Sequence, residues 1–91
     1  MWKENLHMLP EHMQGAMERY IANGIPPGSF LIAILENDLF EAVGRADYEN
    51  VQRLADYVRF LYNYAPSNCF GSKEKVVGWI ISGGMGIDND N

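Results

Sequence analysis

The fold of this chain is centred on residues 25–45, which read Ile25-Pro26-Pro27-Gly28-Ser29-Phe30-Leu31-Ile32-Ala33-Ile34-Leu35-Glu36-Asn37-Asp38-Leu39-Phe40-Glu41-Ala42-Val43-Gly44-Arg45. The two prolines preset φ and suit a helix entry, so a helix is predicted to start near Pro27 or Gly28. At about 100° per residue its apolar side chains reach nearly all the way round, and a helix of that kind is buried. It is too short and too often interrupted by polar residues to span a bilayer. We therefore expect it to form the centre of a soluble core.

Length and composition limit the other possibilities. The 91 residues suit a single domain over 1–91, and 47% hydrophobic against 21% charged residues is typical of a globular protein. The formal net charge of −5 argues against direct binding of nucleic acid, for which a basic face is expected. Cys69 is the only cysteine, and residues 1–8 lack the apolar region of a signal peptide. We expect a cytoplasmic protein without membrane association.

Three further helices are expected around this core. Their start and stop signals are Pro10 to Asn23-Gly24, Asp47 to Pro66, and Ser72 to Gly83-Gly84. Residues 1–9 and 84–91 are expected to be loosely ordered. The predicted fold class is all-α, a compact small bundle of about four helices whose central helix is buried.

The helix expected over residues 48–65 carries two stripes. The main one, expected to be its apolar face, comprises Val51, Leu54, Ala55, Val58, Leu61, Tyr62 and Ala65. The second comprises Arg53, Tyr57, Phe60 and Tyr64. Aromatic residues beside an arginine are typical of interfaces and also stack on nucleobases. Three interpretations of the second stripe stay open: packing within the monomer, an interface with a second copy or partner, and stacking on a ligand.

Asp38 is an anomaly in the predicted central helix, because it falls inside an otherwise apolar sector. A buried carboxylate has to be paired or neutralised. Arg45 lies two turns on, and Arg19 or Arg53 can approach from another helix. One interpretation is a structural salt bridge or helix cap. The other is that Asp38, with Asn37 beside it, lines a polar pocket and accepts hydrogen bonds from a ligand.

The helix entry at Gly28 and Ser29 is a second candidate site. Free backbone N–H groups, a glycine that lets a ligand approach and a serine hydroxyl together favour an anion. The spacing is not that of a phosphate-binding P-loop. The alternative is a stiff turn between helices, capped by Ser29.

No residue pattern predicts catalysis, a metal or a cofactor. His7 and His12 lie near Glu11 but lack further ligands at metal-binding spacing, so they are interpreted as surface residues. Cys69 has no base near it in sequence and is interpreted as a buried or linker thiol. A non-enzymatic protein is therefore expected.

The chain resembles a family of small accessory proteins of bacteriophages and prophages. The resemblance covers residues from Leu9 to about Ile80 and is carried by Gly24-Ile25-Pro26-Pro27-Gly28-Ser29-Phe30-Leu31, Asn37-Asp38-Leu39, Arg45-Ala46-Asp47, Phe60-Leu61-Tyr62-Asn63 and Gly71-Ser72-Lys73-Glu74-Lys75-Val76. It implies no functional residue and no fixed activity. It does imply a phage-type setting, in which small proteins commonly bind a host component, including components of antiviral defence.

Two functional hypotheses follow. The first is a protein that counters host defence by sequestering a small anionic, nucleotide-like signal, helped by homo-oligomerisation. Its expected ligand-binding residues are Gly28, Ser29, Asn37, Asp38, Arg45, Arg53, Tyr57, Tyr64 and Arg19. The alternative is an anti-CRISPR-like inhibitor that binds a host defence protein through an acidic surface, which imitates nucleic acid, or through an aromatic one.

Overall fold

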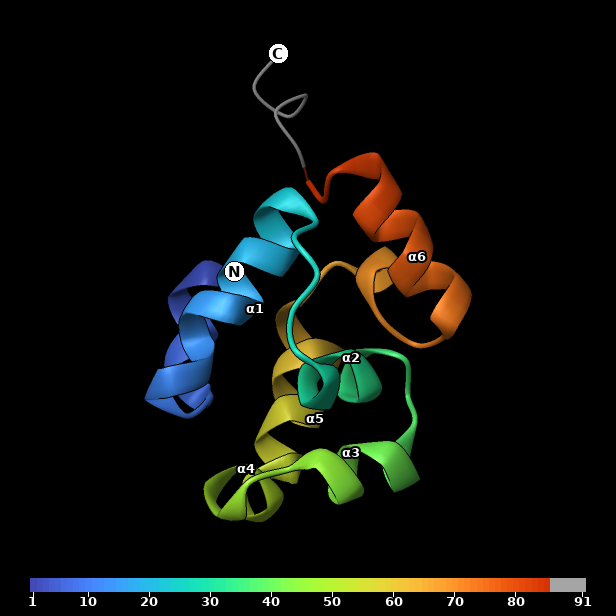
Figure 1. The fold of residues 1–91 in the computed structure, drawn as a ribbon. Coiled ribbons are helices and arrows are strands. Elements are labelled where there is room, and N and C mark those ends of the chain that lie inside the picture. Colours follow the sequence, from blue (N-terminus) through green and yellow to red (C-terminus); the bar gives the residue numbers. More distant parts are fainter. Residues whose placement is uncertain (86–91) are drawn as a thin grey trace.

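A computed structural model describes residues 1–85, and all regular elements in that range are helices (Figure 1). In chain order they are the 3-10 helix η1 (Lys3–Met8), α1 (Glu11–Asn23), α2 (Ser29–Leu35), α3 (Leu39–Arg45), α4 (Tyr48–Gln52), α5 (Leu54–Tyr64), the 3-10 helix η2 (Ser67–Cys69) and α6 (Lys73–Ser82). The predicted all-α class is confirmed. None of the helices in residues 1–85 has the length and apolar character needed to cross a bilayer.

The single central helix predicted over residues 28–45 is wrong, because the chain turns at residues 36–38 and forms two short helices. Asn37 has a φ of 66°, in the left-handed region that a helix cannot contain. The Asp38 carboxylate then accepts a hydrogen bond from the Glu41 backbone N–H at 3.1 Å, which caps α3. Likewise, the helix expected over 48–65 is divided at Arg53 into α4 and α5.

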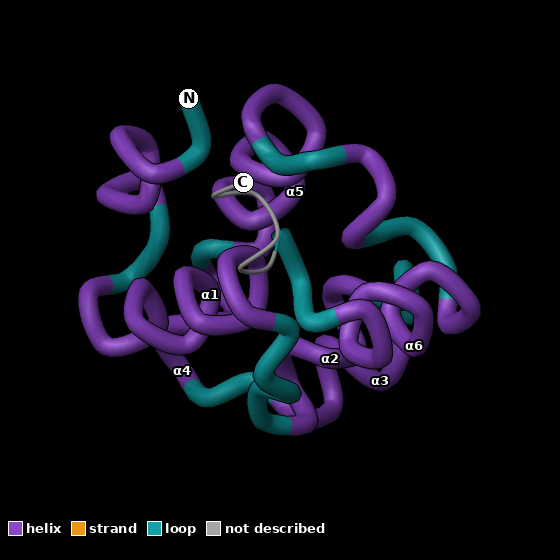
Figure 2. Tube along the Cα trace, turned by 90° about the horizontal axis from the view of Figure 1, so that it is seen from above, coloured by secondary structure: helices purple, strands orange, loops and turns teal. Residues whose placement is uncertain are grey.

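Only the first half of the predicted central helix is buried. Helix α2 packs against α3, α5 and α6, and Figure 1 shows it between α6 and α3. Figure 2 gives the view from above. The rings of Phe30 and Tyr57 pack in a T-shaped arrangement with 5.3 Å between centroids. Helix α3, in contrast, buries only Ala42. The core also takes Met17, Tyr20 and Ile21 from α1, Phe60 and Leu61 from α5, and Val76 from α6.

The N-terminal residues 1–9, expected to be loosely ordered, instead form η1 and pack on the core. Trp2, Leu6 and Leu9 are buried. The Arg53 guanidinium donates to the Met8 carbonyl at 2.7 Å, which ties the end of η1 to the start of α5. Three apolar anchors within nine residues therefore hold this segment in place.

The C-terminal end of α6 is fixed to the end of α1. The Trp79 indole N–H donates to the Tyr20 carbonyl at 3.0 Å, and the Met85 N–H donates to the Ile21 carbonyl at 3.0 Å. Of the tail expected to be loose, Met85 is thus bonded to α1, and the Gly84 N–H donates to the Trp79 carbonyl of α6. Residues 86–91, the rest of that tail, lie outside the described residues.

The turn between α2 and α3 gives a first testable prediction. Asn37→Ala is expected to lower the free energy of unfolding by about 1 kcal/mol, because a Cβ in the left-handed region is strained and alanine lacks the tolerance of asparagine. Asn37→Gly is expected to leave that free energy unchanged or to raise it. Urea unfolding followed by circular dichroism measures both. Equal stability of the two variants would show that residue 37 does not set this turn.

Candidate functional site

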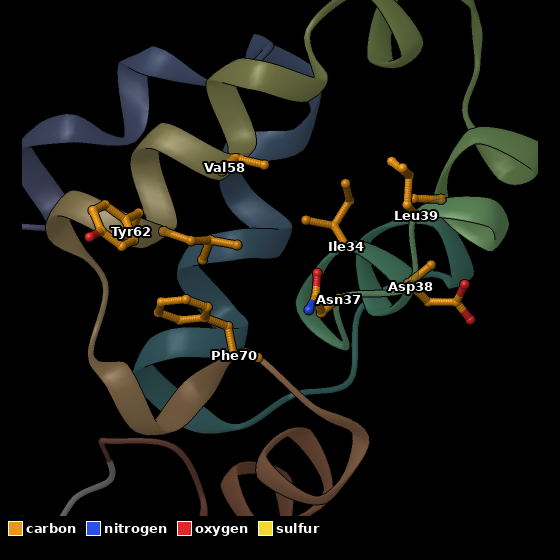
Figure 3. Close-up of a pocket in the computed structure, with 11 residues that line it drawn as sticks. Ile34, Asn37, Asp38, Leu39, Val58, Tyr62 and Phe70 are labelled. Carbon is orange, nitrogen blue, oxygen red and sulfur yellow. The ribbon is translucent and has the colours of Figure 1, made fainter.

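A groove lies between α5 and the α2–α3 pair, with a cavity of about 240 Å³ (Figure 3). Val58 and Tyr62 line it from α5, and Ile34 and Leu39 line it from α2 and α3. Phe70 comes from the segment between η2 and α6. The remaining lining residues are Ala33, Asn37, Asp38, Ala42, Leu61 and Gly71.

Local sequence explains how these residues meet. The turn at Asn37 places Leu39 at the start of α3, and the small Ala42, one turn later, lets α3 pack closely on the core. Val58 and Tyr62 are four apart and so lie on one face of α5. The Gly71 N–H donates to the Leu35 carbonyl at 2.8 Å, which holds the segment containing Phe70 against the end of α2.

The groove is bordered by apolar side chains that remain exposed. The exposed fraction is 59% for Val58, 62% for Leu39 and 81% for Tyr62. On helix α3, Phe40 is 89% exposed and Val43 is also exposed, although neither lines the groove. Scattered apolar residues are normal on a protein surface, but a contiguous set around a groove is typical of an interaction site.

One edge of the groove is acidic. Asp38 lines both the groove and a shallow depression beside it, whose other lining residues include Glu36, Glu41 and Arg45. Arg45 pairs with Glu41, with 2.9 Å between Nε and Oε1. Within residues 1–85, neither Glu36 nor Asp38 has an ion-pair partner at salt-bridge distance. The depression therefore combines three carboxylates with one guanidinium, a charge that repels anions.

Some of the residues predicted to bind an anion do meet here, but in different roles. Ser29, Asp38 and Arg45 line the same depression. The expected buried Asp38 is wrong, because Asp38 is exposed and caps α3 without pairing with Arg45. The predicted cap by Ser29 is also wrong, since Gly28 is the N-cap of α2 and no side chain bonds there. Among the nine residues predicted to bind a ligand, Asn37 and Asp38 line the groove.

Five of the nine predicted residues, Gly28 among them, line neither the groove nor the depression. Tyr57 is fully buried and donates to Asn50 Oδ1 at 2.6 Å, so it is not available to stack on a ligand. Burial raises the pKa of its hydroxyl above the ordinary value. Arg53 pairs with Asp56 and with the Met8 carbonyl. Arg19 is exposed on α1, and Tyr64 is exposed near the end of α5.

Sequence reasoning missed Leu39, Val58, Tyr62 and Phe70 as functional residues. Val58 and Tyr62 were assigned to the main apolar stripe, whereas the buried aromatic residues are Tyr57 and Phe60 of the second stripe. Packing within the monomer is therefore the correct interpretation of those two. The Asn37-Asp38 pair was the available signal for the groove, because both residue types favour a turn and a helix start.

The remaining polar residues lie in smaller clusters. His12 is exposed, 3.2 Å from Asp47 and 3.5 Å from Glu49. The Asn50 N–H, which donates to Asp47, holds the pKa of that carboxyl below its ordinary value. Cys69 is buried, and burial raises the pKa of its thiol to about 12, so it is protonated at neutral pH. In residues 1–85 no three His, Cys, Asp or Glu side chains are arranged to hold a metal ion.

The groove is the feature of the described chain that combines a cavity, exposed apolar walls and a charged edge. That combination is suited to non-covalent binding of a largely apolar partner. No family model, curated protein or solved structure matches this chain.

Proposed function

We propose that this chain is a non-enzymatic, phage-type accessory protein that binds a host protein through the groove between α3 and α5. The proposed target is a component of antiviral defence, and binding inhibits it. The observation that carries the proposal is the apolar groove with exposed Leu39, Val58 and Tyr62. The resemblance to phage and prophage accessory proteins supports the setting.

The apolar lining favours a protein over a small anionic signal. Among residues 1–85, Asp38 is the only charged side chain that lines the groove, and its charge opposes a phosphate. Capture of a nucleotide-like anion, the first hypothesis from the sequence, loses support because Arg45 is paired and Arg19 and Arg53 lie elsewhere. Burying one large apolar side chain contributes about 1.5–3 kcal/mol, so apolar contacts along the groove supply a favourable term that a phosphate would not.

Site-specific photo-crosslinking in bacterial cells tests the proposal. We expect a photoreactive phenylalanine at position 62 to give one discrete adduct with a host protein. The matched control is position 81 on α6, because Ile81 and Tyr62 are 79% and 81% exposed. Position 81 is expected to give no such adduct, since it does not line the groove.

A functional readout completes this test. In hosts that carry defence systems, expression of the wild-type chain is expected to raise the plating efficiency of a restricted phage, and Tyr62→Ala is expected to abolish the rise. Ile81→Ala is expected to retain it. Adducts at both positions alike, or equal activity of both variants, would contradict a role for the groove.

A further inference from the structure

We infer that the groove accepts an amphipathic helix of the partner, which inserts one bulky apolar side chain between α3 and α5 and presents a lysine or arginine to Asp38 and Glu36. This inference rests on the proposed function and specifies its partner. Three observations support this inference: the size of the cavity, the absence of a strand edge within residues 1–85 that could pair with an extended partner, and the acidic edge.

The size of the cavity fits one large side chain. An engineered protein cavity of about 150 Å³ holds a benzene ring. The groove provides about 240 Å³, enough for a phenylalanine, leucine or methionine side chain. Figure 3 shows Ile34 and Leu39 on one side and Val58, Tyr62 and Phe70 on the other. A single anchor entering between them contacts both walls, as hot-spot residues at interfaces do.

The walls favour a helical partner over an extended one. Most of the lining comes from helices, whose backbone groups bond within each element, and the Gly71 N–H from the segment after η2 already bonds to the Leu35 carbonyl. Residues 1–85 contain no strand edge. An extended segment buried here would leave its N–H and C=O groups unpaired, which is costly. A helix satisfies its own backbone groups and lays one apolar face into such a groove.

The charge at the edge selects the polar face of that helix. Asp38 Oδ1 accepts the Glu41 N–H at 3.1 Å, and the carboxylate points away from the apolar lining (Figure 3). Glu36 lines the adjoining depression. A lysine or arginine flanking the apolar anchor is thus complementary to two carboxylates that have no ion-pair partner within residues 1–85.

A second copy of this chain is the competing occupant. The homo-oligomer expected from the sequence stays a prediction. Each copy has a formal net charge of −5, so a second copy meets the acidic edge with like charge overall. A basic segment of another protein is the more complementary partner.

The test uses two labelled peptides of about 18 residues with the same leucine and phenylalanine stripe. One has lysines on its polar face and the other glutamates. Fluorescence polarisation with the full chain is expected to favour the lysine peptide by about fivefold or more. Tyr62→Ala is expected to weaken both peptides, while Ile81→Ala leaves both unchanged.

Two matched substitutions isolate the charge at the edge. Asp38→Asn removes the charge but keeps a good N-cap on α3, and it is expected to weaken the lysine peptide by about threefold to fivefold. Asp47→Asn makes the same change at the N-cap of α4, away from the groove, and is expected to leave that peptide unchanged. Thermal unfolding of each variant verifies the fold.

Equal affinity for the two peptides, or an equal loss in Asp38→Asn and Asp47→Asn, overturns the inference. The inference is also overturned if the fraction of dimer rises with protein concentration and Tyr62→Ala dissociates the dimer, because a second copy then occupies the groove.

Failure of the inference can be distinguished from failure of the proposed function. A host adduct at position 62 without any peptide preference leaves the proposed function standing and rejects the basic helix. A preference for the lysine peptide without a host adduct supports the basic helix as the ligand of the groove and rejects the proposed host target.

Discussion

Replacing Gly84 with alanine is expected to lower the free energy of unfolding by about 2–5 kcal/mol, through backbone strain and steric overlap. Gly84 has a φ of 72°. A Cβ there would overlap the Gly24 nitrogen and would lie 2.8 Å from both the Asn23 nitrogen and the Ile21 carbonyl oxygen. All three are backbone atoms of the end of α1 and its cap, which cannot move aside as a flexible side chain does. The close approach of α6 to α1 therefore requires glycine at this position.

Gly83 and Gly78 provide matched controls for the Gly84 substitution. Gly83→Ala shares a positive φ, 83°, but its Cβ meets no atom within 4 Å, so it is expected to cost only the strain of about 1–2 kcal/mol. Gly78→Ala lies in α6 with open space around it and is expected to stabilise the helix by about 0.5–1 kcal/mol. Urea unfolding of the three variants measures these differences. Equal costs at positions 83 and 84 would contradict the packing of α6 on α1.

Local chemistry allowed several helix ends to be predicted from the sequence. Gly24 and Gly83, which were predicted to end α1 and α6, are the C-caps of these helices and adopt the left-handed conformation. Asp47 accepts from the Asn50 N–H at 2.7 Å, and Ser72 accepts from the Lys75 N–H at 3.2 Å. Such caps depend on residues within three or four positions, and therefore a single sequence contains the information they need.

The division of the predicted central helix was harder to predict, because helical periodicity continues through residues 36–38. Apolar residues on both sides of the turn fit one helical projection nearly as well as two. What decides between them is the tolerance of Asn37 for a positive φ and the capping bond of Asp38. With the turn in place, α3 folds back beside α2 and its apolar face is left exposed.

The groove itself could not be predicted from the sequence. Its walls come from residues 33–42 and 58–71, and their approach depends on how α5 packs on α2. The apolar sector of α5 is wider than one buried face can use. The face of α5 that was predicted to pack on the core is rotated by roughly a quarter turn from the face that is buried. The stability of α5 variants tests this correction directly.

Phe60→Ala is expected to lower the free energy of unfolding by about 3–5 kcal/mol, because it removes a fully buried ring and leaves a cavity. Tyr62→Ala, two residues away on the same helix, is expected to change it by less than about 0.5 kcal/mol, since that side chain is mostly exposed. Leu61, between them, is buried, so the core face of α5 runs through Tyr57, Phe60 and Leu61. Chemical unfolding of the two alanine variants measures both effects.

The two variants also separate folding from binding. If α5 faced the core with its main predicted stripe, Tyr62→Ala would be the more destabilising change, and a binding defect at position 62 would reflect unfolding. In the described packing, Tyr62→Ala retains the wild-type stability and loses the partner, whereas Phe60→Ala loses stability first. A comparable loss of stability in both variants would reject the exposed wall of the groove, and with it the assignment of Tyr62 to the partner's binding surface.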